Sequence, residues 1–110
     1  MFNRELKKGS TELVILALLE HGPRHGYEIG KLIEVRSGGS LQYRVSALYP
    51  ILCRLEERDL VKGTWVERAG ERRRRHYSLT VAGREVLKEE RETWREYTLA
   101  VNRIVGVGDA

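Results

Sequence analysis

Apolar residues recur at helical spacing in the first third of the chain and predict two short helices there. Ser10 is placed to cap the first one, and the run LVILALL over residues 13–19 has no polar face, so this helix should be buried on most sides. Gly22 and Pro23 should end it. The second helix is expected over residues 26–36, before two glycines, with an inward face of Ile29, Leu32 and Ile33.

A third helix is predicted to begin near Val45 or Ser46, and its two sides differ in polarity. Its apolar stripe consists of Val45, Leu48, Leu52 and Leu55. Ser46, Pro50 and Arg54 are four residues apart and form the opposite row, which is polar enough to face a ligand. We expect the Ser46 hydroxyl to cap the first turn. Pro50 should lie close to that turn, because a proline deep inside a helix removes a hydrogen bond.

After Asp59 the pattern changes to that of a β-hairpin, with strands over residues 61–66 and 72–79 and a turn at Ala69 and Gly70. Side chains alternate along a strand. One face of the second strand should therefore carry Arg73, Arg75, Tyr77 and Leu79, and the other Arg72, Arg74, His76 and Ser78. Trp65, on the first strand, is expected to pack against the body of the protein.

Thr80 is placed to cap a last helix, which nothing interrupts for about 25 residues, or about 37 Å. Large apolar residues recur along it at seven-residue spacing, in an interrupted seam made of Leu87, Trp94, Tyr97, Val101 and Ile104. A lone helix would expose these aromatic side chains to water. We therefore expect a homodimer that forms through this helix.

These elements predict a mainly α protein with a small β-hairpin. A helix docked on a core and followed by a basic hairpin is the outline of a winged helix-turn-helix, here with a long C-terminal dimerisation helix. Residues 1–79 would form the DNA-binding domain, and residues 80–110 the dimerisation helix and tail, in one compact unit.

The net charge of +4 is concentrated in the predicted hairpin. Residues 61–79 contain 6 Lys/Arg and 2 Asp/Glu, whereas residues 1–60 contain 9 and 8, and residues 80–110 contain 5 and 6. Such a local excess is typical of a contact with a polyanion. An edge strand protected from aggregation by charge needs only one or two such residues, so four consecutive arginines favour phosphate binding.

Double-stranded DNA is the expected partner, with the third helix in the major groove and the hairpin on the phosphates. A dimer would read a pseudo-palindromic operator. For Tyr27, in the first turn of the second helix, a phosphate contact and a core position with a hydrated hydroxyl both stay open. The candidate DNA contacts are Tyr27, Arg44, Ser46, Tyr49, Arg54, Arg72, Arg73, Arg74 and Arg75.

No pattern typical of an enzyme appears in the sequence. It has no phosphate-cradling glycine loop and no nucleophile with a partnered base. The three histidines are scattered, so neither a metal nor another cofactor is expected. Cys53 is the only cysteine, which excludes an intrachain disulfide and suits the cytoplasm. The charged N-terminus is unlike a signal peptide, and the run over residues 13–19 is too short to cross a membrane.

Three motifs resemble the PadR family, the phenolic acid decarboxylase regulators: HGYEI (25–29), LYPILCRLEERDLV (48–61) and RRRRHYSLTVAGR (72–84). The resemblance implies a winged-helix transcriptional regulator, usually a dimeric repressor, of the short branch with a single C-terminal helix. Asp59 departs from the pattern, because the family usually has a helix-ending glycine there. Aspartate tolerates the left-handed conformation less well than glycine.

The same resemblance gives Trp94 a second interpretation. In the short branch, a tryptophan fourteen residues after the threonine that matches Thr80 lines a cleft between the subunits, where planar aromatic ligands stack in some members. Thr80 and Trp94 have this spacing. A packed position in the dimer core would also explain Trp94, so both interpretations stay open. Tyr97 and Val101 would be neighbours of such an effector.

Two rival functions remain. An RNA-binding winged helix could grip an A-form backbone with the same hairpin, although the aromatic stacking face of single-strand readers is missing. A ligand-binding dimer without DNA binding is the second rival, and the intact arginine cluster argues against it.

Overall fold

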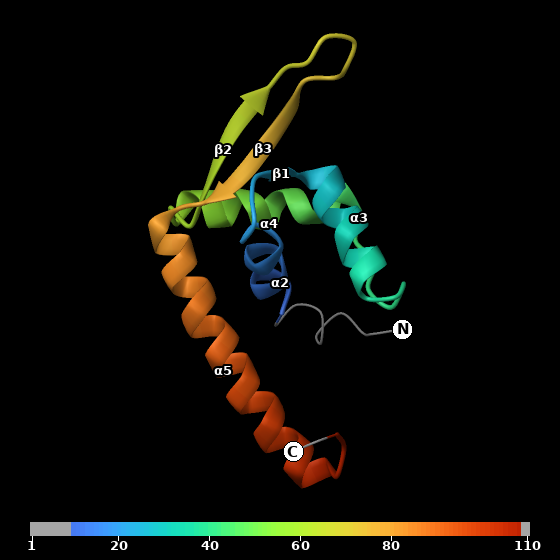
Figure 1. Cartoon of the computed structure of the whole chain (residues 1–110), viewed down its shortest axis with the longest axis vertical. Coiled ribbons are helices and arrows are strands. Elements are labelled where there is room, and N and C mark those ends of the chain that lie inside the picture. Colours follow the sequence, from blue (N-terminus) through green and yellow to red (C-terminus); the bar gives the residue numbers. More distant parts are fainter. Residues whose placement is uncertain (1–9, 109–110) are drawn as a thin grey trace.

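The computed structural model describes residues 10–108, so the prediction about the charged N-terminus falls outside it. Four helices and three strands make up this part of the chain (Figure 1). In chain order they are α2 (Thr11–Leu18), β1 (Arg24–His25), α3 (Gly26–Arg36), α4 (Val45–Glu57), β2 (Val61–Val66), β3 (Arg74–Leu79) and α5 (Val81–Val105). The predicted class, mainly α with a small β-hairpin, is confirmed.

A single apolar core lies where α2, α3, α4 and the base of the sheet meet. Ile15 of α2, Ile29 of α3 and the α4 residues Leu48, Leu52 and Leu55 are all completely buried. These are the apolar positions that the helical spacing identified. The hairpin of β2 and β3 projects from one side of this body, and α5 extends from it in another direction (Figure 1).

Helix α4 begins at Val45, as predicted, but its cap differs from the prediction. Arg44 is the N-cap residue, and no side chain caps the helix. The backbone of Arg44 is extended, and its carbonyl oxygen accepts hydrogen bonds from the N–H groups of Ala47 (2.9 Å) and Leu48 (3.2 Å). Ser46 is already a helical residue, so the prediction that it caps the helix was wrong. Its side chain is exposed instead.

The end of α4 depends on a left-handed residue. Asp59 has a φ of 59°, the only positive φ of a non-glycine residue within 10–108. The N–H of Leu60 donates to the carbonyl oxygen of Leu55 (2.9 Å), and that of Asp59 to Glu56 (3.0 Å). This is the Schellman pattern of hydrogen bonds, which normally uses glycine at the position of Asp59. Asp59 therefore adopts the left-handed conformation at the position where the family pattern has a glycine.

The sheet has three antiparallel strands in the order β1-β3-β2. The short strand β1 was not predicted, because two residues are too few for an alternating pattern. It pairs His25 with His76. Strand β3 begins at Arg74, two residues later than expected, so Arg72 and Arg73 belong to the connection with β2. β2 and β3 with their connection form the wing, residues 61–79.

Thr80 caps α5 as predicted. Its hydroxyl accepts a hydrogen bond from the Gly83 N–H (2.9 Å) and donates one to the Asp59 carbonyl oxygen (2.7 Å). The helix has the expected 25 residues and ends at Gly106, which has left-handed geometry. Leu87 is buried in the core cluster of the single chain, so it is not open to a partner as the seam suggested. The C-terminal half of α5 lies apart from the other helices and strands (Figure 1).

Candidate nucleic-acid interface

The outer side of α4 presents an exposed polar surface beside the wing. Ser46, Tyr49 and Arg54 are all exposed, while the opposite side of the helix is buried in the core. Arg54 forms no ion pair with any residue of the described range 10–108. Cys53 is also exposed here. Helix α4 therefore has an accessible face with an uncompensated charge and hydrogen-bonding groups.

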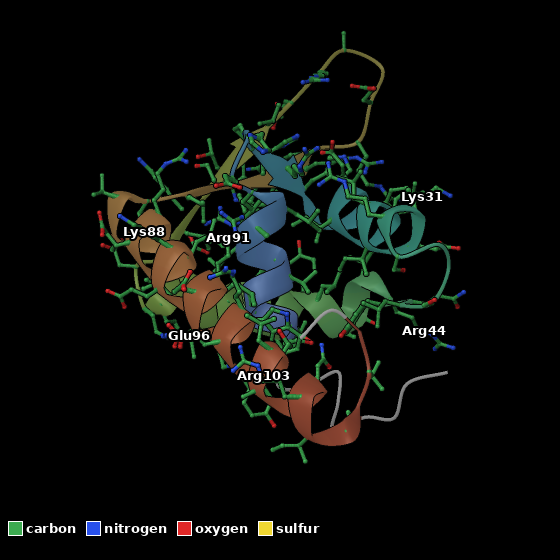
Figure 2. All side chains as sticks on the ribbon, turned by 60° about the horizontal axis from the view of Figure 1, so that its bottom comes forward. Lys31, Arg44, Lys88, Arg91, Glu96 and Arg103 are labelled. Carbon is green, nitrogen blue, oxygen red and sulfur yellow. The ribbon has the colours of Figure 1, made fainter. Side chains whose placement is uncertain are left out.

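Arg44 extends this surface at the N-terminal end of α4. Figure 2 shows its side chain at the edge of the molecule, away from α5. Its side chain is exposed and lacks an ion-pair partner among residues 10–108. A guanidinium group in this state is available to a phosphate, because no carboxylate competes for it.

Two of the four consecutive arginines at residues 72–75 are held by carboxylates of the same chain. The Arg75 guanidinium donates to a carboxylate oxygen of Glu56 on α4 (2.8 Å), and the same oxygen accepts from the Gly63 N–H (3.1 Å). This contact raises the pKa of Arg75. Arg73 lies 3.4 Å from a carboxylate oxygen of Glu67. These two arginines therefore act within the wing, and Arg75 also joins it to α4.

Trp65 lies close to both of these guanidinium groups, and the prediction that it packs against the body was wrong. The centre of its ring is 4.4 Å from the guanidinium carbon of Arg73 and 5.5 Å from that of Arg75. Almost half of the side chain is exposed (48%). Trp65 points to the same side of β2 as Val61, which is buried, but it lies farther out along the wing, beyond the edge of the core.

Arg72 and Arg74 differ from their neighbours because no carboxylate within residues 10–108 pairs with them. The guanidinium carbon of Arg74 lies 5.6 Å from the centre of the Tyr27 ring. Tyr27 itself is 64% exposed, which excludes a core position within the single chain. The first turn of α3 thus places a tyrosine beside Arg74 of the wing.

The wing, the start of α3 and the start of α4 enclose a groove of about 320 Å³. Its lining combines charge with aromatic rings: Tyr27, Val45, Tyr49, Trp65 and Arg72, Arg73, Arg74 and Arg75, together with His25 and Gly26. Six of the nine residues expected to contact DNA line this one groove. Ser46 and Arg54 lie on the same helix as Tyr49, and Arg44 directly precedes it.

Two acidic residues and a histidine have roles that the sequence analysis did not identify. Glu56 holds Arg75, as described above. The Nδ1 atom of His25 accepts a hydrogen bond from the Glu28 N–H (3.1 Å) and so caps α3. Burial, and next the charge of Arg74, lowers the pKa of His25. Histidine is an uncommon cap, so composition alone gave no signal for it.

The third of these residues, Glu20, pairs with an arginine of α5. Arg91 of α5 donates two hydrogen bonds to the Glu20 carboxylate (2.9 and 3.1 Å), which lowers the pKa of Glu20. Figure 2 shows Arg91 beside α2, whereas Arg103 lies near the far end of α5. A bidentate pair restricts orientation as well as distance. This specific contact therefore supports the angle between α5 and the body.

The remaining seam residues of α5 are open to a partner or a ligand. Trp94, Tyr97 and Ile104 are 47%, 64% and 86% exposed, and Val101 is half-buried. Trp94 and Tyr97 line a groove of about 590 Å³ between α5 and α2, whose other apolar lining includes Leu13, Leu16, Leu60 and Val86. The structure brings these two aromatic residues to one groove, with Ile104 farther along the helix.

The described residues contain no group of three or more metal-binding side chains that could hold an ion. No helix among them has the length and apolar character needed to cross a membrane.

Comparisons with known proteins agree with this geometry. The profile of the transcriptional regulator PadR-like family matches residues 15–89. A solved transcriptional regulator from Clostridium thermocellum has a TM-score of 0.85 at 28% identity, and the match covers 96% of this chain and 99% of that one. A PadR family transcription regulator from hypervirulent Clostridium difficile R20291 has a TM-score of 0.76 at 28% identity, over 88% and 99%.

Among curated relatives, the transcriptional regulator YqjI of Escherichia coli K12 is 34% identical over 84 residues. The match covers 76% of this chain and 39% of that regulator. Proteins of the matched family are transcriptional regulators and not enzymes, which agrees with the missing catalytic pattern. The chain belongs to the PadR-like family of transcriptional regulators, and it is a DNA-binding regulator with a winged helix-turn-helix fold.

Proposed function

We propose that this regulator is a homodimeric repressor that reads a pseudo-palindromic operator with α4 and releases it when an effector binds at α5. The observation that carries the DNA-reading part is the exposed face of α4 beside the groove with Arg72 and Arg74, which no carboxylate within residues 10–108 pairs with. Ser46, Tyr49 and Arg54 are the residues proposed to reach base edges or the groove rim. Base contacts supply specificity, and phosphate contacts most of the affinity.

The phosphate contacts are assigned to Tyr27, Arg44, Arg72 and Arg74. Arg73 and Arg75 were expected to share this role. Their carboxylate partners, Glu67 and Glu56, compete with phosphate for them. We assign these two arginines mainly to shaping the wing and contacting Trp65. A phosphate could still displace Glu67, because the Arg73–Glu67 pair is exposed on both sides.

The proposed homodimer forms through the exposed part of α5. Tyr97 and Ile104 are large apolar residues that are mostly in water in the single chain. Their contact with a second copy would remove this surface from water, and the same contact would cover the half-buried Val101. In a dimer, the direction of α5 sets the distance between the two α4 helices, which a duplex requires to be about 34 Å or a multiple of it.

The proposed effector site is the groove beside Trp94. A planar aromatic molecule could stack on the half-exposed indole, and Tyr97 and the apolar floor from α2 would complete its contacts. Such a ligand weakens DNA binding only to the extent that it prefers one dimer shape over another. Since Arg91 and Glu20 link α5 to α2 near this groove, a change there alters the angle of α5.

The test begins with selection of bound sites from random duplex DNA at physiological salt, followed by fluorescence anisotropy on a selected site. If a dimer neutralises about six phosphates, the logarithm of affinity should fall against the logarithm of salt with a slope near −5. Arg44→Gln should reduce the magnitude of this slope by about 1 for each lost contact. Arg103→Gln is the matched control, because that residue is equally exposed but lies near the far end of α5.

Arg54→Ala should reduce discrimination between the selected site and random DNA by about 1–3 kcal/mol. Two outcomes would contradict the proposal. Tighter binding to structured RNA than to any duplex DNA would favour the RNA-binding function. A dye that binds at Trp94, together with no detectable DNA affinity, would favour a ligand-binding dimer without DNA binding.

A further inference from the structure

The face of the sheet that points away from α4 carries a pocket larger than the two grooves described above, with a volume of about 860 Å³. On β3, Arg75 and Tyr77 face α4 and the core, so Arg74, His76 and Ser78 face the other way. The pocket is formed where these residues meet β1, the start of α3 and the turn of the wing. Its basic and aromatic lining consists of His25, Tyr27, Arg68, Arg72, Arg74 and His76.

Positive charge in this pocket is not neutralised by the chain. Arg68, Arg72 and Arg74 form no ion pair within residues 10–108, in contrast to Arg73 and Arg75. Two carboxylates also line the pocket. That of Glu28 is held by Arg24 at 3.1 Å, and that of Glu71 is exposed at the wing turn. Arg68, Arg72 and Arg74 therefore leave an excess of positive charge on one side of the wing.

The floor of the pocket contains a pair of histidines. The rings of His25 and His76 lie edge to face, with their centres 5.2 Å apart. An Arg74 nitrogen lies 3.2 and 3.3 Å from the two ring nitrogens of His25. The Nδ1 atom of His76 is buried and has no hydrogen-bond partner among residues 10–108. A buried polar atom of this kind indicates a missing partner, such as a ligand or a bound water.

We propose that this pocket binds a phosphate group and that His25 takes up a proton when it does. Three guanidinium groups supply donors that match the oxygens of a phosphate. An anion there would offset the positive charges that now oppose protonation of the His25 imidazole. By linkage, a site that gains a proton on binding phosphate also binds phosphate more tightly when the pH falls.

The charged groups around His25 agree with the uptake of a proton when an anion binds. Burial is the first cause that lowers the pKa of His25, and Arg74 on β3 is the second. Glu28 on α3 acts in the opposite sense, whereas His76 on β3 and Arg68 in the wing turn act with Arg74. Most of the nearby groups thus keep the imidazole neutral in the empty pocket. A bound dianion would reverse the balance of charge at this point.

The phosphate can come from the DNA backbone or from a free phosphorylated molecule. Tyr27, Arg72 and Arg74 line both this pocket and the groove beside α4. A DNA strand held in the groove beside α4 could therefore place a further phosphate in the pocket. If the phosphate comes from DNA, the inference rests on the proposed function. A free phosphate would need only the pocket itself.

The first experiment follows the side-chain NMR signals of the three histidines between pH 5 and 8. Sulfate is the probe, because it is tetrahedral like phosphate and its charge is constant over this range; chloride at equal ionic strength is the control. We expect sulfate to raise the titration midpoint of His25. The signals of His21, which lies outside the pocket, should not shift when sulfate is added and serve as an internal reference. Equal midpoints in sulfate and chloride would overturn the proposal.

The second experiment uses variants of the full chain. His25→Asn keeps a side chain that can cap α3 but does not titrate. Arg68→Gln removes a charge that lines this pocket but not the groove beside α4. Arg68→Gln should weaken sulfate binding, whereas Arg73→Gln, on the other side of the wing, should not. If Arg54→Ala reduces discrimination between DNA sequences and leaves the sulfate response intact, the base-reading face of α4 and the pocket are distinct sites, as proposed.

The last measurement identifies the source of the phosphate. A duplex that fills the pocket should abolish the sulfate response and bind more tightly at pH 6 than at pH 8. The gain should be up to about tenfold for a histidine whose pKa rises by one pH unit on binding, and it should be absent in His25→Asn. A sulfate response that persists in the DNA complex assigns the pocket to a free phosphate. Retention of the full gain at pH 6 in His25→Asn would refute the role of His25.

Discussion

Replacement of Gly83 by alanine has two opposing effects on the stability of the fold. Gly83 lies in the first turn of α5, where helix propensity alone predicts that alanine stabilises the fold by up to about 1 kcal/mol. The structure predicts the reverse, because a Cβ atom at this position would overlap the carbonyl oxygen of Leu60. That oxygen belongs to the backbone of the α4–β2 corner and cannot rotate away as a side chain would.

The size of the effect follows from what must move. The first turn of α5 has to withdraw until the two atoms reach ordinary contact, at 3.4 Å or more. This shift strains the hydrogen bonds of Thr80 to the Leu60 carbonyl oxygen (3.2 Å) and the Asp59 carbonyl oxygen (2.7 Å), each worth about 1 kcal/mol. It also disturbs the packing of Leu87, and overpacking typically costs about 1–3 kcal/mol. We expect a net loss of about 2–4 kcal/mol.

The assay is urea unfolding followed by circular dichroism, with all variants at the same chain concentration because a dimer's stability depends on it. Ala82→Gly is the matched control, since Ala82 is exposed in the same turn and reports the propensity effect alone. It should lower the free energy of unfolding by no more than about 1 kcal/mol. A Gly83→Ala protein as stable as the wild type, or more stable, would refute the close approach of α5 to Leu60.

Three further predictions concern stability and assembly. Asp59→Gly should stabilise the fold by about 1 kcal/mol, because glycine adopts the left-handed conformation without strain; an unchanged or lower urea midpoint would contradict this. Val101→Asp with Ile104→Asp should prevent dimer formation, so sedimentation should find unfolded or aggregated chains, and a well-folded monomer at micromolar concentration would argue against an obligate dimer. Because the folded state lowers the pKa of His25 from the unfolded value of about 6.5, the unfolded state binds protons more readily. The melting temperature should therefore fall as the pH drops below about 6.5, and His25→Asn should reduce that fall.

Structural features that depend on residues close together in the chain could be predicted from the sequence. The apolar positions at helical spacing identified the buried faces of α3 and α4, and Thr80 identified the start of α5. The left-handed turn at Asp59 was indicated by the resemblance to the PadR family, whose pattern has a helix-ending glycine at this position. In each case the deciding contacts lie within about one turn of helix, so the local chain contains the information.

The state of each wing arginine was decided only by the tertiary structure. The sequence shows four equivalent arginines in a row, but Arg75 meets a carboxylate 19 residues away, and Arg74 meets His25 across 49 residues. The pairing of Arg91 with Glu20 spans 71 residues. Charge counts and alternation cannot identify such partners, because they depend on how α4, β1 and α2 pack.

The candidate site combines both kinds of information. Its residue types and the order of its elements come from local patterns, which is why the polar face of α4 and the basic wing could be predicted. Which arginines pair with a carboxylate, why Trp65 stays exposed and how β1 places His25 beside His76 depend on strand pairing and helix packing. Local propensity determines which elements form, whereas contacts between residues distant in sequence determine which charges are neutralised and which remain available to a ligand.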